Sequence, residues 1–225
     1  MTAHNIGALN EKALHADLKQ WYRQSGDATE IKVDGFIIDI VRDDLLIEIQ
    51  TRNFSAIKRK VLALTATHPV RVVYPVAREK WIVRQGKDGK QLGRRKSPRR
   101  GALLQVFEEL VSFPELMAHA NFSLDVLSIQ EEEVRRYDKR RGWRRHGWVT
   151  HERRLLKVLD RHIFADPEDC VRLLPQDLTE PFTTRELATA LDRSRRFSQK
   201  MAYCLHRMGA LTQTGKRGNA WLYAR

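Results

Sequence analysis

The fold is decided by residues 39–50, which read DIVRDDLLIEIQ. Apolar runs lie on both sides of the two central aspartates, and they predict two β-strands joined by a short turn. Asp39, Glu48 and Gln50 fall within these runs, at positions where a strand normally buries hydrocarbon. Charged side chains are rarely buried unless they are paired or bind a metal. The placement of these three polar residues therefore needs a physical explanation.

Antiparallel pairing of the two strands places Asp39 directly opposite Glu48. Opposed Cβ atoms lie roughly 4.5–5.5 Å apart, and Gln50 shares their face because side chains alternate along a strand. A divalent cation between the acids turns their repulsion into attraction. Mg²⁺ takes one or two carboxylates and leaves room for phosphate oxygens, so we expect a metal site that faces a phosphate-bearing ligand. The alternative is that Asp39 pairs with Arg42 or Lys58 and that Glu48 points outward.

The sequence around this hairpin predicts a mixed α/β (α+β) architecture. Asp34-Gly35 between two apolar runs is typical of a hairpin turn and adds a third strand to the meander. A mixed sheet flanked by helices is the expected result. The predicted helices cover residues 6–23, 54–67 and 102–111, and the predicted strands cover residues 30–33, 36–41, 45–51, 70–76, 81–85 and 122–130.

The pattern D39-x8-E48-x-Q50, between a helix and a second helix followed by a buried strand, resembles the PD-(D/E)XK (restriction-endonuclease-like) nuclease superfamily over residues 6–85. The resemblance implies that Asp39 and Glu48 bind Mg²⁺ or Mn²⁺ and that Glu11 on the first helix contributes to catalysis. It also implies that Gln50, where the family usually has lysine, orients the attacking water or the substrate. The implied reaction is phosphodiester hydrolysis, with Arg52 and Lys58 contacting phosphate near the site.

The C-terminal part predicts three helices, over residues 151–164, 183–191 and 194–209, followed by two short strands around a basic turn. This order resembles a winged helix-turn-helix domain over residues 149–225, which implies a recognition helix and a wing in contact with DNA. We expect Met201, Tyr203, Cys204, Leu205 and Met208 on the inner side of the third helix. The expected contact residues at its exposed start and in the wing are Arg195, Arg196, Ser198, Gln199, Lys200, Lys216 and Arg217.

The charge of the chain indicates a polyanionic partner. Its 225 residues contain 41 Lys and Arg against 28 Asp and Glu, a net charge of +13. Eight basic residues and one acid lie in residues 84–100, and residues 139–161 hold nine basic residues and two acids, with Arg144 and Arg145 among them. We expect two domains, a nuclease-like domain over residues 1–138 and a basic linker with the winged helix over residues 139–225.

Other sequence features limit the class of protein. The two cysteines have no C-x-x-C spacing, which argues against a zinc module or a disulfide-rich fold. No stretch approaches the roughly 18 apolar residues of a membrane helix, so a cytoplasmic protein is expected. We therefore predict a DNA-binding, Mg²⁺-dependent nuclease, with a homodimer as an option for paired cuts. The alternatives are a non-catalytic DNA-binding protein or regulator with a degenerate nuclease fold, and a protein-interaction scaffold.

Overall fold

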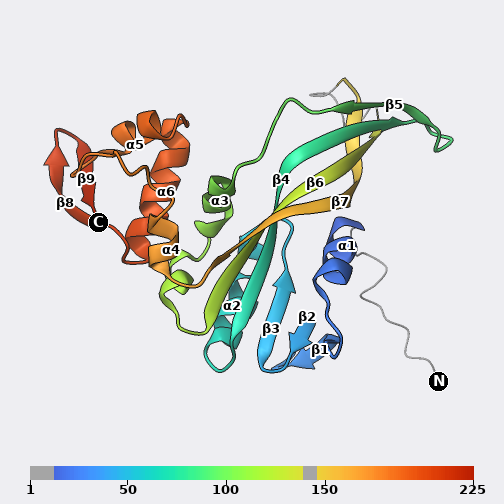
Figure 1. Cartoon of the computed structure of the whole chain (residues 1–225), viewed down its shortest axis with the longest axis horizontal. Helices are drawn as coiled ribbons and strands as arrows, with labels where there is room; N and C mark the ends of the chain where they lie inside the picture. Colours follow the sequence, from blue (N-terminus) through green and yellow to red (C-terminus); the bar gives the residue numbers. More distant parts are fainter. Residues whose placement is uncertain (1–12, 139–145) are drawn as a thin grey trace. The chain divides into compact units, whose positions relative to one another are not determined.

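The computed structural model describes residues 13–138 and 146–225 (Figure 1). The chain forms two compact units. One unit contains the residues up to 27 together with residues 75–102 and 127–161, and the other contains residues 28–74, 103–126 and 162–225. Three long strands, β4 (Val70–Gln85), β6 (Phe122–Tyr137) and β7 (Trp148–Phe164), contribute residues to both units.

The mixed sheet flanked by helices that the sequence predicts is confirmed. β1 (Ala28–Val33), β2 (Phe36–Arg42) and β3 (Leu45–Ile49) form an antiparallel meander. β3 then pairs in parallel with β4, through a crossover that contains the 3₁₀ turn η2 (Phe54–Ala56) and helix α2 (Lys58–Thr65). The strand order is β1-β2-β3-β4-β6-β7, with β5 (Gln91–Lys96) paired to β4.

The first turn of the meander follows its sequence. Asp34 and Gly35 both have positive φ, 48° and 85°, which suits a two-residue turn whose twist matches that of the flanking strands. A residue with a branched side chain would be strained at these angles. The Asp-Gly pair therefore fixes the register of β1 against β2.

An aromatic cluster forms the core of the second unit. Phe54 stacks on Phe113 at 5.3 Å between ring centroids, and Tyr74 meets Phe54 edge-on at 5.2 Å. Phe54 and Phe113 are almost completely buried, and each such side chain stabilises the fold by about 1.5–3 kcal/mol. The short helical segments that supply this layer are η3 (Leu103–Gln105), α3 (Val106–Leu110) and η4 (Pro114–Ala118).

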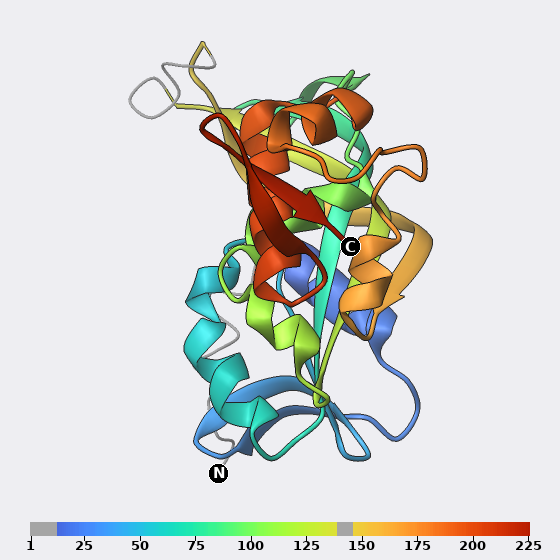
Figure 2. The same ribbon diagram turned by 90° about the vertical axis from the view of Figure 1, so that its left-hand side faces the viewer.

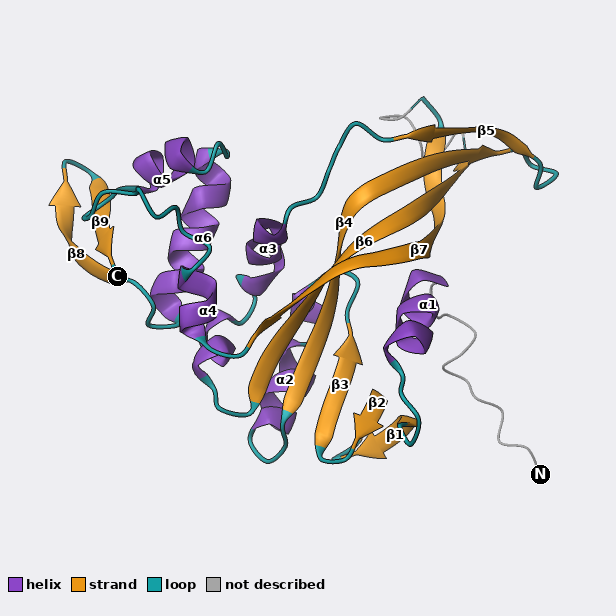
Figure 3. Cartoon of the chain, viewed as in Figure 1, coloured by secondary structure: helices purple, strands orange, loops and turns teal. Residues whose placement is uncertain are grey.

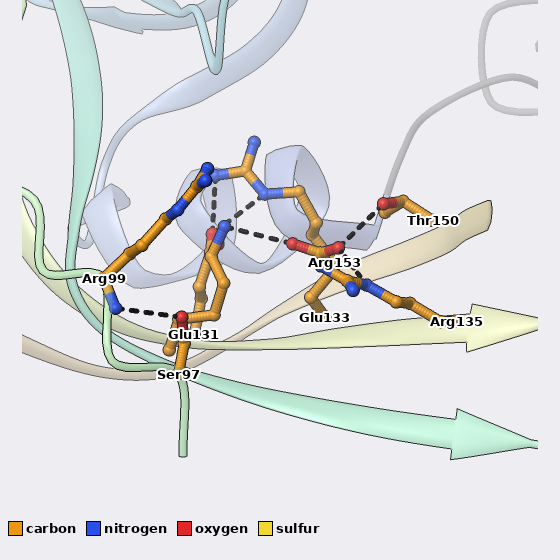
Figure 4. Close-up of polar contacts among 8 residues, drawn as sticks. Ser97, Arg99, Glu131, Glu133, Arg135, Thr150 and Arg153 are labelled. Atoms are coloured by element: carbon orange, nitrogen blue, oxygen red, sulfur yellow. Dashed lines mark hydrogen bonds and ion pairs between the residues drawn. The ribbon is translucent and has the colours of Figure 1, made fainter. Parts of the chain in front are cut away.

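The first unit combines helix α1 (Ala13–Tyr22) with β5 and parts of β4, β6 and β7. The Asp17 carboxylate accepts a hydrogen bond from the Leu155 N–H at 2.9 Å, and Arg161 donates to the Tyr22 hydroxyl at 2.6 Å. These two bonds tie α1 to β7. Next to them, acids of β6 meet cations of neighbouring strands in a buried ion-pair network, shown in Figure 4.

Several predicted elements differ from the structure. Residues 151–164, expected as a helix in the C-terminal module, form most of strand β7, which pairs with β6. The apolar residues of this stretch fit a helical period, but pairing with a long neighbouring strand overrides that local preference. The strands expected over 70–76 and 81–85 are one continuous strand, β4.

The C-terminal segment contains three helices and a hairpin. They are α4 (Pro167–Val171), α5 (Thr184–Ala190), α6 (Arg195–Arg207), β8 (Thr212–Arg217) and β9 (Ala220–Ala224). Thr183 and Glu186 form the capping box that their spacing predicts, and this box starts α5. His206 of α6 lies against Tyr223 of β9, so the helix and the hairpin are side by side, as Figures 2 and 3 show.

The packing of α6 corrects two residues. Met201, Cys204, Leu205 and Met208 face inward as expected, but Tyr203 is 46% exposed. Ser198, expected at the exposed start of the helix, is completely buried. Buried positions recur three and four residues apart on a helix, and Phe197, Met201 and Cys204 set a face that includes position 198 and excludes position 203.

Candidate metal centre and nucleic-acid interface

The β2–β3 hairpin brings the two predicted acids together. Val41 pairs with Leu46 and Ile40 with Ile47, the register expected from the sequence. One step further along this register, Asp39 lies against Glu48. The Asp39 Oδ2 atom accepts a hydrogen bond from the Ile49 N–H at 2.8 Å. A side-chain oxygen thus takes a position that a backbone carbonyl holds in a regular ladder, and this fixes the Asp39 carboxylate beside β3.

Glu48 is the buried member of the pair. It is 5% exposed, whereas Asp39 is half-buried and reaches the surface. Burial, and secondarily the negative charge of Asp39, raise the pKa of Glu48 to about 7. The nearby ammonium of Lys60 acts in the opposite direction. Near pH 7 the buried carboxyl is therefore about half ionised, and an added cation would favour its ionised form.

Lys60 on helix α2 completes the cluster. Its ammonium contacts the Glu48 Oε1 atom and donates to the Ile37 carbonyl, so it bridges β2 and β3. The sequence predicts Lys58 of α2 as a phosphate contact, and it does not predict this ion pair. The available signal is topological: the helix that crosses from β3 to β4 must pack on the hairpin, so one of its lysines can reach Glu48.

Gln50 is engaged by the turn that follows β3. Its amide nitrogen donates to the carbonyls of Arg52 and Asn53 at 2.6 and 2.9 Å. Asn53 has a φ of 58°, so this amide holds a left-handed turn in place. The amide oxygen of Gln50 accepts no hydrogen bond from residues 13–138 or 146–225. The predicted phosphate contacts Arg52 and Lys58 are exposed.

The donor set fits a hard divalent cation. Within residues 13–138 and 146–225, no three His, Cys, Asp or Glu side chains gather as a metal site, so the centre rests on the carboxylates of Asp39 and Glu48. Two carboxylates are enough for Mg²⁺, because waters and substrate phosphates complete its octahedral shell. The third acid expected from the sequence, Glu11, lies outside the described residues.

Two of the predicted nucleic-acid contacts of the C-terminal segment, Arg195 and Arg217, line a groove. Arg195, Arg196 and Gln199 are exposed near the start of α6, and the Ser194 hydroxyl caps its first turn. The adjoining hollow has a volume of about 850 Å³, and its lining includes Arg185, Arg195 and Arg217. The lining also includes Asp177 and Glu186, and Glu186 pairs with Arg217, so Arg185 and Arg195 are the lining cations that would favour an anionic ligand.

The two basic residues of the wing each contact a neighbouring side chain. The Lys216 ammonium lies 4.4 Å from the centre of the Trp221 ring, and Arg217 pairs with Glu186 at 2.6 Å. Lys200 is partly exposed on α6. The predicted linker contacts Arg144 and Arg145 lie outside the described residues.

Arg195 offers a direct test of the interface. We expect Arg195→Gln to weaken binding to a DNA duplex by about 8-fold at 0.1 M salt and to reduce the salt slope by about 1, as for one lost phosphate contact. Arg207→Gln, at the other end of α6 and paired with Glu115, is the matched control and should leave the affinity unchanged. Equal effects of both variants in filter-binding titrations would contradict the placement of the interface.

Three comparisons place the chain among known proteins. A protein from Treponema pallidum (strain Nichols), described as "Uncharacterized protein", is 31% identical over 221 residues, 97% of this chain and 86% of the relative. No solved structure matches. No helix among residues 13–138 and 146–225 has the length and apolar character needed to cross a membrane. A family model matches residues 12–165, and the chain belongs to this family, the "Domain of unknown function (DUF8091)".

Proposed function

We propose that the protein is a DNA-binding, metal-dependent nuclease that hydrolyses phosphodiester bonds. The observation that carries the proposal is the convergence of Asp39, the buried Glu48 and Lys60 on one face of the β2–β3 hairpin. Two acids held together in an apolar sheet are unfavourable for folding alone, and a cation-binding role accounts for them. The meander, the crossover helix and the parallel strand also support the resemblance to PD-(D/E)XK nucleases.

In the proposed mechanism, Asp39 and Glu48 would hold a Mg²⁺ or Mn²⁺ ion. Bound there, the ion would act as a Lewis acid that polarises the phosphate and lowers the pKa of the attacking water. The Lys60 ammonium would stabilise negative charge that develops on the phosphate. Gln50, fixed through its amide nitrogen, presents its oxygen to a water or to the substrate.

Targeting is the proposed role of the C-terminal segment. Its helices and hairpin, with α6 preceding β8 and β9, support a winged helix whose α6 enters the major groove of DNA. The exposed cations at the start of α6 would face the groove and the adjacent phosphates. Residues 162–225 hold ten of the 41 basic and seven of the 28 acidic residues, so this segment carries only part of the excess of positive charge.

The proposal is tested with purified protein on plasmid, linear and branched DNA, with Mg²⁺, Mn²⁺ or EDTA. Metal-dependent cutting by the wild type, and none by Asp39→Ala or Glu48→Ala, is the expected result. Lys60→Met should bind the same DNA and cut it more slowly. Equal cutting by wild type and the acid variants would refute the site.

A second candidate function is a non-catalytic DNA-binding protein or regulator. The observation that favours it is the Glu48–Lys60 ion pair, which neutralises the buried acid without a metal. This function predicts tight DNA binding by the wild type and no cutting with either ion. It also predicts that Mg²⁺ does not change the unfolding temperature of the protein.

Metal binding should depend on pH because the ion needs ionised Glu48. With a pKa of about 7, roughly a tenth of Glu48 is ionised at pH 6 and roughly nine tenths at pH 8. We expect the affinity for Mn²⁺ to be about 10-fold weaker at pH 6 than at pH 8, as measured by titration calorimetry. Asp39→Asn, which removes a ligand and the negative neighbour, should weaken binding at both pH values.

A further inference from the structure

The β4–β5 hairpin and the residues that follow it are strongly basic. Residues 84–100 contain eight basic residues and one acid. Every residue of β5 is exposed, and β5 pairs only with β4 in the described sheet. Lysines and arginines on an edge strand protect it from pairing with other chains. That purpose is served whichever face of the strand carries the charges.

The cations on the two faces of this hairpin have different partners. Residues directly opposed across an antiparallel pair share a face. Trp81 pairs with Lys96 and Val83 with Arg94, which defines the first face. Ile82 pairs with Arg95 and Arg84 with Gly93, which defines the second face.

Cations on the first face are already neutralised. Arg94 pairs with Glu132 at 2.9 Å, and Lys96 pairs with Glu79 at 3.0 Å. Both groups also lie over the ring of Trp81, at 5.1 and 5.0 Å from its centre. These contacts hold the two side chains against the sheet, and little of their charge is available to a ligand.

On the second face two guanidinium groups have no acid. Arg84 and Arg95 are exposed, and neither pairs with a carboxylate of residues 13–138 or 146–225. Arg84 lies over Trp148 at 4.9 Å, which orients it without neutralising it. Gly93, opposite Arg84, leaves open space beside it, since a Cβ there would meet nothing within 4 Å.

The acids nearest this face are occupied. On β6, Glu131 binds Lys80 and Arg153 at 2.8 and 2.5 Å. Glu133 binds Lys80 at 3.1 Å and Arg135 at 2.7 Å. Figure 4 shows Glu131, Glu133, Arg135 and Arg153 of this network. The acids of this network are therefore paired with cations of the network, and they do not neutralise the positive charge of Arg84 and Arg95.

We propose that the second face of the β4–β5 hairpin, carrying Arg84 and Arg95, binds the phosphate backbone of a DNA duplex. The proposal rests on the proposed function for the choice of DNA as partner. Two unneutralised guanidinium groups, one of them oriented by Trp148, lie beside the open space at Gly93 and suit phosphate oxygens, which arginine binds with two parallel hydrogen bonds. This contact is additional to the one proposed for α6 and needs no base-specific hydrogen bond.

A pair of charge-matched double variants tests the proposal. Arg84→Gln with Arg95→Gln and Arg94→Gln with Lys96→Gln each remove two positive charges from one hairpin. Binding to a fluorescently labelled 20-base-pair DNA duplex is measured by anisotropy in EDTA, between 50 and 300 mM NaCl. The first variant should bind about 60-fold more weakly at 0.1 M salt, with a salt slope smaller by about 2. The second should bind within twofold of the wild type.

Several outcomes would overturn the proposal, provided that all three proteins unfold at the same temperature. They are equal losses in the two double variants, no loss in either, no duplex binding by the wild type, and tighter binding of an RNA duplex of the same sequence. The catalytic proposal fails separately. A wild type that binds DNA through Arg84 and Arg95 but does not cut it with Mg²⁺ would leave this inference intact.

Discussion

Glu48→Gln is expected to abolish metal-dependent DNA cleavage and, in the same protein, to increase stability at pH 8 in EDTA. The loss of cleavage follows from the loss of a ligand to the ion, whose contribution of about 4 kcal/mol corresponds to about 1000-fold in rate. A glutamine of the same shape keeps the packing of the buried side chain. The two opposite effects together identify an acid retained for function at a cost in stability.

The sign of the stability change follows from the raised pKa of Glu48, about 7 in the fold against 4.5 ordinarily. The folded state holds this proton more tightly than the unfolded state does. Stability is therefore greatest at low pH and falls as the pH rises from about 4.5 through 7. The difference of about 2.5 pKa units corresponds to at most about 3 kcal/mol, so we expect a gain of about 1–3 kcal/mol at pH 8.

Urea unfolding measures the free energy of unfolding at pH 5, where Glu48 is protonated, and at pH 8, where it is ionised. The Glu48→Gln protein should be as stable as the wild type near pH 5 and more stable at pH 8. Asp44→Asn, an exposed acid in the turn of the same hairpin, should change neither stability nor cleavage. A Glu48→Gln protein that is less stable than the wild type at pH 8 would mean that the Glu48–Lys60 ion pair is a structural contact.

Glu131→Gln should give the largest loss of stability, about 3–5 kcal/mol. The Glu131 carboxylate is completely buried between Lys80 at 2.8 Å and Arg153 at 2.5 Å. Removing the Glu131 charge leaves Arg153 without its acid and leaves Lys80 with only Glu133 in this network, and breaking a buried ionic network costs more than the network contributes in net terms. Urea unfolding at pH 7 measures the difference directly.

The neighbouring residue provides the control. Glu132→Gln makes the same chemical change one position along β6, where the acid is partly exposed and pairs with the exposed Arg94. Pairs of this kind contribute about 0–1 kcal/mol, so the control should be almost as stable as the wild type. Similar losses of stability in both variants would show that the ion pairs of Glu131 contribute no more than the exposed pair of Glu132.

Much of the hairpin centre could be predicted from the sequence because its determinants are local. The alternation of side chains along two short strands and the two-residue turn between them set Asp39 against Glu48 without knowledge of the rest of the fold. The Lys60 contact could not be read in this way, because it depends on how the crossover helix packs on the hairpin. The resemblance assigns Gln50 to the attacking water or the substrate, whereas in the structure its amide nitrogen binds the backbone turn after β3.

The helix predicted over residues 151–164 is wrong because pairing with another strand decides the structure there. The apolar residues of this stretch fit both a helix and a half-exposed strand, and the choice between them is made by β6, which lies outside the window that a local pattern uses. In α6 the helix itself was expected, but one face was misjudged. Ser198 is small enough to be covered by neighbouring side chains, whereas the larger Tyr203 lies at the edge of the buried stripe.

The burial of both cysteines bears on which ions the protein can compete for. Cys170 and Cys204 are nearly inaccessible, and burial raises the pKa of each thiol to about 12. Thiolates are the soft ligands that draw zinc and copper in cells. With these two sulfurs kept protonated inside the C-terminal helices, neither thiol supplies such a ligand. The metal site proposed on the β2–β3 hairpin would rest on carboxylate oxygens, the donors that suit magnesium and manganese.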